Sequence, residues 1–440
     1  MGEVVFFLVL SGALLAVFFP WIGIIDGYTS ILLGPHVLWW WSFTNHNHFL
    51  YISVGTSAGI ILFALRGRIK YKYLLNIQNF FLLGWLTFII FSYLWGPYIK
   101  YEATQGFFSP NFVFPIIIKS FFFYFLSILC INKVDIFKYF CCVIIFTSVF
   151  FIFWINKEYL SGSIGRIGGP VGLNATQYGD ENNFAMFFVI SMPFLYNIKT
   201  FFKNKLICNF IFLTIPLGWH AVFLTGSRGG FLSLFFITAL NFIKSTNKKL
   251  SFLLFILFLA MIYFQGGSTL KDRLTIYADK STVEESAQGR FNSWIAASKM
   301  IASHPFTGVG VSSFGAAFPF FSDKPPLEAH NTFLQIGAES GIFALTFYLC
   351  FLVTTLRKLY NIISTPFKGH DNNIHCMHLE RVAKLIFLSW TGFAFCAFFL
   401  SLQIFEQFFY LAIISNYVIT NTKQHNIKPS SLDTYNPNAT

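Results

Sequence analysis

The sequence predicts an all-α integral membrane protein, a bundle of about 12 or 13 transmembrane helices with one large outer loop region that contains helices of its own. Its 440 residues are 55% hydrophobic and 11% charged, and the mean hydropathy of +0.62 lies outside the range of soluble domains. Apolar runs of about 20 residues, long enough to cross roughly 30 Å of hydrocarbon, recur along the whole chain. They lack the residue-by-residue alternation of membrane strands, so helices are expected.

The apolar runs define the expected helices in chain order. The first run has no basic region before it and no small-residue cleavage site after it, which favours a retained helix over a signal peptide. Whether the second run spans the membrane decides between twelve and thirteen spans, and hence on which side the N-terminus lies. The runs are 4–19, 21–35, 48–65, 74–95, 112–131, 137–155, 184–198, 206–224, 230–243, 250–264, 332–356, 385–401 and 407–420.

Every second connection between these runs is basic. By the positive-inside rule the basic loops face the cytoplasm. The net charge of +12 is therefore mostly a sign of topology, and we expect no nucleic acid partner. The basic loops are "RGRIKYK", "NKVDIFK", "KTFFKNK", "KSTNKK" and the segment 357–384.

The other loops face outward and hold most of the Gly, Pro and polar residues that do not simply connect helices. The longest of them is a large outer loop region, 265–331. No internal repeat or inverted pair of broken helices is visible, so residues 1–420 are expected to form a single polytopic membrane domain. The polar, proline-containing stretch 421–440 is expected to be a disordered cytoplasmic tail.

One arginine stands out in an apolar stretch on the outer side, "AVFLTGSRGGFLSLFF". Positive φ at Gly226, Gly229 and Gly230 could turn backbone N–H groups towards an anion beside Arg228, and the positive end of the next helix dipole would face the same place. A phosphate suits such a site. The alternative is a tight turn whose arginine reaches to lipid head groups.

Two further candidates follow on the same side. In "GRFNSWIAASKMIASHPFTGVGVSSF", Arg290 is expected to open an amphipathic helix, 289–303, that carries Trp294. In "PPLEAHNTFLQIGAESGIFAL", His330 lies where the chain re-enters the membrane. Arginines can hold a diphosphate, and a histidine can accept a proton from a hydroxyl. The alternative for His330 is a residue that caps the helix.

Other charged residues are weaker candidates for the same site. Glu339 lies about 180° around a regular helix from His330, so we expect it to pair with an arginine. Lys119, about two turns below the outer surface, either lines the cavity or extends to head groups. Arg166, in the glycine-rich "GSIGRIGGPVG", is a third candidate diphosphate ligand or an exposed loop residue. Asp180 and Glu181 either contribute to the site or only cap a helix.

No metal or cofactor is expected. The histidine-containing stretches "NHNH" and "HDNNIHCMH" lack a complete set of zinc ligands at a familiar spacing. Six of the seven cysteines fall in apolar runs and form no disulfide pattern. Phosphate-binding loops and dinucleotide fingerprints are also missing from the sequence.

The order of these motifs resembles that of the O-antigen ligase and O-antigen polymerase superfamily, most closely its branch of exosortase-associated O-glycosylation ligases. In that branch an Asp usually precedes paired asparagines; here Glu181 precedes Asn182 and Asn183. The segments that carry the resemblance are "GPHVLWWWSF", "RIGGPVGLNATQYGDENNFAMFFVISMP", "SRGG", "GRFNSW…HPFTGVGVSSF" and "AHNTFLQIGAESG".

The resemblance implies an inverting, metal-independent glycosyltransferase. It would move a glycan from undecaprenyl diphosphate to an acceptor hydroxyl, on lipid A core or on a protein, at the periplasmic face of the bacterial inner membrane, which makes 265–331 a large periplasmic loop region. Arg228 and Arg290 would hold the diphosphate, and His330 would activate or orient the acceptor. Lesser substrate-binding candidates are Arg166, Lys119, Glu339, Glu181 and Asn182.

Two other functions remain open. A polymerase that extends the lipid-linked glycan would use the same chemistry with another acceptor. A transporter or flippase of an anionic lipid-linked sugar would instead place its charges near the bilayer midplane. The candidate charges cluster at the outer ends of the helices, which favours chemistry at one face of the membrane.

Overall fold

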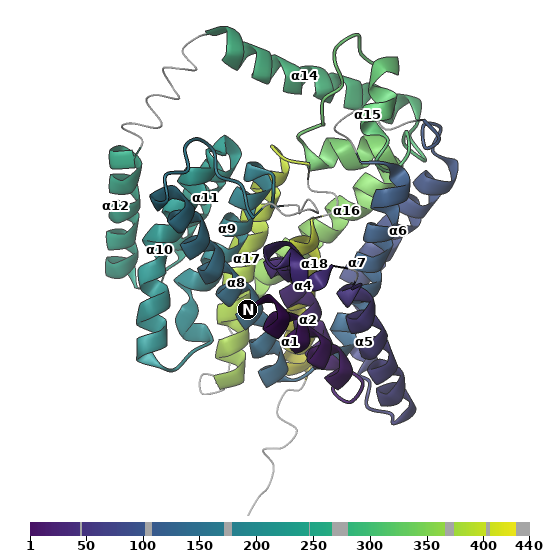
Figure 1. Cartoon of the computed structure of the whole chain (residues 1–440). Coiled ribbons are helices and arrows are strands. Elements are labelled where there is room, and N and C mark those ends of the chain that lie inside the picture. The colour runs from purple at the N-terminus through teal and green to yellow at the C-terminus, as the bar shows by residue number, and fades with distance from the viewer. Residues whose placement is uncertain are drawn as a thin grey trace, which may run out of the picture.

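The computed structural model describes the chain except for residues 45, 102–107, 171–177, 246, 266–279, 366–373, 402–404 and 428–440. In these described ranges the regular secondary structure is helical and no strand occurs (Figure 1). This confirms the predicted all-α class.

Each of the thirteen apolar runs forms a helix. Within the part of the chain that the structure describes, six of these helices are long and apolar enough to cross a membrane: α5, α6, α7, α8, α10 and α16. The number of spans beyond these six stays a prediction. The helices are α1 (Gly2–Leu15), α2 (Pro20–Leu33), α5 (His48–Leu65), α6 (Ile77–Trp95), α7 (Pro110–Cys130), α8 (Val134–Leu160), α9 (Glu181–Tyr196), α10 (Lys205–Thr225), α11 (Arg228–Lys244), α12 (Lys248–Gln265), α16 (Thr332–Ser364), α17 (Ile374–Ala397) and α18 (Glu406–Ile427).

Shorter elements and one further long helix connect them. The predicted amphipathic helix is α14, which begins at Lys280 and not at Arg290, because good helix formers such as Glu, Ala and Gln extend it beyond its apolar face. Figure 1 shows α14 and α15 together at one end of the bundle. The connecting elements are α3 (Pro35–Leu38), α4 (Trp40–Phe43), η1 (Tyr71–Tyr73), η2 (Ile198–Thr200), α14 (Lys280–Ser303), α15 (Phe314–Ala317) and η4 (Phe318–Phe320).

The C-terminal helix corrects the predicted start of the tail. α18 continues to Ile427, so residues 421–427 are helical and not disordered. The reason is polar contact with the bundle: the Asn421 side chain accepts hydrogen bonds from Lys72 Nζ and Tyr73 Oη, both at 3.2 Å. The remainder of the predicted tail lies outside the described residues.

A single helix, α9, lies at the centre of the bundle. Every side chain from Phe184 to Leu195 is buried. A helix that is apolar on all sides needs neighbours on all sides, and α9 packs against α8, α10, α11 and α17. Its N-terminus, which carries Asp180 and Glu181, is thereby held among the ends of several helices.

A buried polar cluster fastens the opposite, basic end of the bundle. Asn79 Nδ2 and Asn416 Nδ2 both donate to the carbonyl oxygen of Tyr73, at 2.7 and 3.0 Å. Tyr124 Oη donates to Asn79 Oδ1 at 2.6 Å. Hydrogen bonds gain strength in a low-dielectric interior, so this cluster ties α6, α7 and α18 together.

The helix that follows the outer loop is interrupted. Gly341 in α16 has φ 85° and ψ 170°, a conformation that is essentially restricted to glycine. Neighbouring backbone groups bond to the loop after α14 instead of to their own helix: Ile342 N donates to Pro305 O at 2.8 Å, and Gly310 N donates to Glu339 O at 3.1 Å. The kink therefore locks the outer loop onto a membrane helix.

We expect Gly341→Ala to destabilise the protein by about 1–3 kcal/mol, because a side chain there is strained. Its Cβ would also lie 2.5 Å from Phe306 O. Thermal unfolding in detergent measures the effect. Gly67→Ala is the control, since Gly67 has φ +65° but nothing within 4 Å of an added Cβ. Equal losses in the two variants would contradict this role for the kink.

Candidate functional site

Arg228, in the stretch "AVFLTGSRGGFLSLFF", lies at a helix start, as predicted. α10 ends at Thr225, its C-cap Gly226 has φ 63°, and α11 begins at Arg228. Ser227 caps α11, its Oγ accepting from Gly230 N at 3.2 Å. The expected positive φ at Gly229 and Gly230 is wrong, because both residues are helical. They allow close packing instead: a Cβ on Gly230 would lie 2.6 Å from that of Ala185 in α9.

A second arginine joins the start of α9 to the end of α10. Arg166 Nε donates to Thr225 O at 3.0 Å, and its Nη2 donates to Asn182 Oδ1 at 3.1 Å. The same Nη2 lies 3.5 Å from Glu181 Oε2, and both side chains of this ion pair are about one third exposed. Three residues predicted separately, Arg166, Glu181 and Asn182, are thus brought together next to the turn that carries Arg228.

The glycines after Arg166 fix the path of its loop. Ile167 N donates to Leu224 O at 3.1 Å, and Gly169 N donates to Tyr178 O at 2.6 Å. A Cβ on Gly169 would lie 2.7 Å from the Cβ of Tyr178. Side chains at this point would push the loop away, so the glycines allow Arg166 to reach Thr225.

A third arginine, Arg290, reaches the same place from α14. Partial burial lowers the pKa of Arg290, and the positive charges of Arg228 and Arg166 lower it further. The guanidinium groups of Arg228 and Arg166 therefore both lie within electrostatic reach of Arg290. One turn further along α14, Trp294 Nε1 donates to Ala329 O at 3.0 Å. That bond holds α14 against the segment that carries His330.

The histidine lies just outside its helix. His330 has φ 45°, and the next residue, Asn331, caps α16 by accepting from Phe333 N and Leu334 N, each at 3.0 Å. Asn331 therefore does the capping that was the alternative role of His330. Burial lowers the pKa of His330 below its ordinary 6.5, the charge of Arg290 acts in the same direction, and Asp180 opposes them. The imidazole is thus neutral near pH 7.

Two carboxylates accompany the histidine. Asp180 caps α9, its Oδ1 accepting from Asn182 N and Asn183 N at 2.9 Å each. Sequence reasoning missed Glu328, whose pKa is raised by the crowding of protein atoms and then by the charge of Asp180, although part of its side chain stays exposed. No local pattern in the sequence marks Glu328, because its place near Asp180 depends on a contact between segments that are distant in sequence.

The expected arginine partner of Glu339 is wrong. The Glu339 side chain is buried, with 1% of its surface exposed. Its Oε2 accepts from Ser312 N at 2.9 Å, and its Oε1 accepts from Gln335 Nε2 at 3.3 Å. A carboxylate buried in a membrane protein requires such donors. In these contacts Glu339 holds the outer loop on α16, a structural role.

The lysine candidate is not brought to the arginines by any described contact. Lys119 lies in α7 with its side chain exposed, so its place in the site stays a prediction. Among the described residues, no group of three or more His, Cys, Asp and Glu side chains could hold a metal ion. Metal independence likewise stays a prediction.

Residues 213–349 match the model of the O-antigen ligase family. The match extends from α10 into α16 and includes Arg228, Arg290 and His330, while Arg166, Glu181 and Asn182 precede it. It confirms the resemblance to the O-antigen ligase superfamily; the exosortase-associated branch stays a prediction. No curated protein and no solved structure matches the chain.

We expect charge changes around His330 to move its pKa in opposite directions. Arg290→Gln removes a positive neighbour and should raise the pKa, whereas Asp180→Asn removes a negative one and should lower it further. Modification of neutral imidazole by diethyl pyrocarbonate, located by mass spectrometry at His330 across pH, measures both. Lys299→Gln removes one charge elsewhere on α14 and is the control. If the pKa of His330 is the same in Arg290→Gln and Asp180→Asn as in the wild type, these two charges do not act on His330.

Proposed function

We propose that this O-antigen ligase-like membrane protein transfers a glycan from undecaprenyl diphosphate to an acceptor hydroxyl, on lipid A core or on a protein, at the periplasmic face of the inner membrane. The family match supports glycan transfer in a membrane. The observation that carries the proposal is the convergence of Arg228, Arg166 and Arg290 beside His330, which is neutral near pH 7.

The arginines suit a diphosphate. Three positive charges that repel one another gain most from a ligand with several negative charges, and guanidinium groups can hold phosphate oxygens in pairs of hydrogen bonds. Arg228 is also the first residue of α11, so the positive end of that helix faces the same ligand. Arg228 and Arg290 lie within the residues that match the family model, whereas Arg166 precedes them, so we assign donor binding mainly to Arg228 and Arg290.

The histidine suits the acceptor. In a single displacement, the acceptor oxygen forms a bond to the anomeric carbon while the bond from that carbon to the diphosphate oxygen breaks, which inverts the configuration. The hydroxyl proton passes to the neutral imidazole of His330. Asp180 favours the protonated imidazole, and the lipid diphosphate leaves with its charge held by the arginines.

Of the two alternative functions, the arrangement of these side chains fits a polymerase better than a transporter. A polymerase differs only in its acceptor, so the arrangement of these side chains fits it equally. A transporter should carry its charges near the bilayer midplane. Arg228 begins its helix, and Arg290 and His330 lie outside the membrane-spanning helices, which favours chemistry at one face.

We expect the arginine variants to lose donor binding and the histidine variant to lose transfer rate. Arg228→Lys and Arg290→Lys keep the charge but lose the planar fork, so binding of a non-reactive undecaprenyl-diphosphate glycan should weaken. His330→Ala should lower the transfer rate by about 10²–10⁴ and leave donor binding nearly intact. Arg357→Lys, on an exposed part of α16, is the matched control. A folded His330→Ala protein with the wild-type rate would remove His330 from the site.

We also expect transfer to continue after divalent cations are removed, because guanidinium groups neutralise the leaving diphosphate where other enzymes use magnesium. Transfer by purified protein in EDTA, compared with untreated protein, measures this. Activity that is lost in EDTA and restored by one particular metal would contradict it.

A further inference from the structure

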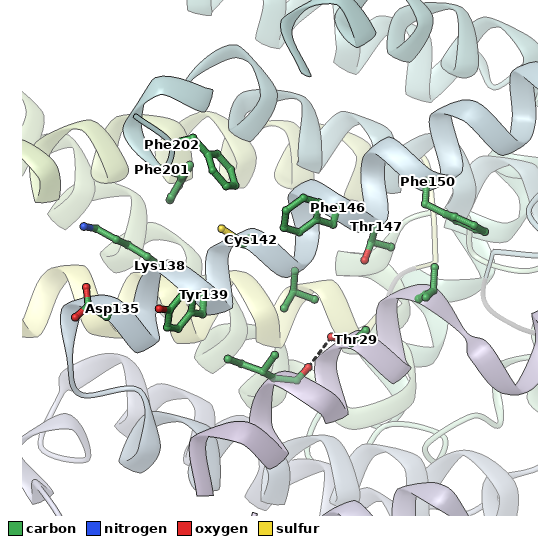
Figure 2. Close-up of a pocket in the computed structure, with 13 residues that line it drawn as sticks. Thr29, Asp135, Lys138, Tyr139, Cys142, Phe146, Thr147, Phe150, Phe201 and Phe202 are labelled. Carbon is green, nitrogen blue, oxygen red and sulfur yellow. Dashed lines mark hydrogen bonds between the residues drawn. The ribbon is translucent and has the colours of Figure 1, made fainter. Parts of the chain in front are cut away.

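A groove runs along α8 (Figure 2). It has a volume of about 830 Å³ and lies between α2, α8 and the pair Phe201 and Phe202. It shares no residue with the candidate glycan site. The α8 side chains that form its floor include Lys138, Tyr139, Cys142, Phe146, Thr147 and Phe150.

The shape of the groove suits a hydrocarbon chain. Its α8 residues recur every three or four positions from Asp135 to Phe150, one continuous stripe about 22 Å long at 1.5 Å per residue. On the α2 wall the only hydroxyl, Thr29 Oγ1, donates to Ile25 O at 2.7 Å. Tyr139 and Phe146 are both 56% exposed, so the groove is open along its length to the surroundings of the bundle.

One end of the groove is basic. Figure 2 shows Lys138 and Asp135 together there, beside Tyr139. The adjoining loops carry only further lysines: Lys133 precedes α8, and Lys199, Lys203 and Lys205 flank the two phenylalanines in sequence. The lysines outnumber the single carboxylate, Asp135, so this end of the groove complements an anion. Basic pockets between membrane helices on the cytoplasmic side bind anionic lipid head groups.

The sidedness agrees with this charge. The groove begins beside the basic loop "NKVDIFK", which the positive-inside rule assigns to the cytoplasm. α8 has 27 residues, about 40 Å at 1.5 Å per residue. Its far end leads to Arg166. The groove and the arginines thus lie towards opposite membrane surfaces.

We propose that this groove holds one anionic phospholipid of the phosphatidylglycerol class. Its phosphate lies at Lys138, and one acyl chain follows the α8 stripe between α2 and the two phenylalanines. The lipid is distinct from the glycan donor, and its binding is independent of transfer.

Native mass spectrometry of the full chain, released from a detergent mixture of equal phosphatidylglycerol and phosphatidylcholine, tests the head-group contact. We expect the wild type to retain phosphatidylglycerol preferentially and Lys138→Ala to lose about fivefold of that preference, the effect of one lysine near an anionic head group. Lys157→Ala is the control, since Lys157 lies at the other end of α8 and pairs with Glu158 at 3.6 Å. A Lys138→Ala protein as selective as Lys157→Ala would overturn the proposal.

A second variant tests the acyl path. Thr147→Trp fills the apolar half of the groove, so the folded variant should retain less of both lipids at this site; unchanged retention would also overturn the proposal. If this variant does not fold, the two lysine variants still decide. A third arm adds undecaprenyl phosphate. Preferential retention of that lipid, lost in Lys138→Ala, would identify a polyprenyl site and contradict the phospholipid assignment.

Discussion

Like charges repel, and one end of this bundle holds the guanidinium groups of Arg228 and Arg166 within electrostatic reach of Arg290. Arg228 is fixed by the capped start of α11, and Arg166 by its bonds to Thr225 O and Asn182 Oδ1. Arg290 reaches the cluster because Trp294 bonds α14 to Ala329. Each cation comes from a different segment, so the positive potential depends on the packing of the whole outer end. A polyanionic ligand would relieve the repulsion.

The outer loop owes its position to the interruption of α16. Gly341 breaks the helix, and the loop after α14 supplies hydrogen bonds to the freed backbone groups. Glu339 adds to this lock by accepting from Ser312 N. A carboxylate buried in a membrane protein is usually read as part of a substrate path. In this fold it serves the loop, and the loop in turn places His330 at the mouth of the bundle.

Much of the fold could be predicted because apolar runs set helix positions directly: all thirteen runs are helical. Arg228 at a helix start followed from a local glycine pattern. The sequence could not show that Gly229 and Gly230 serve helix packing, since that depends on Ala185 in another helix and on Phe399 beyond the end of a third. The partners of Glu339 and the position of Glu328 were hidden for the same reason. They depend on contacts between segments that are distant in sequence or on an extended path that has no periodic signal.

The most direct test of the account is a cryo-electron microscopy structure of the protein in nanodiscs with a non-reactive undecaprenyl-diphosphate glycan. The account predicts that the diphosphate lies within hydrogen-bond distance of Arg228 and Arg290, with the anomeric carbon turned towards His330. A diphosphate bound elsewhere, for example at the Lys138 end of the α8 groove or beside Lys119, with the three arginines unoccupied, would contradict it.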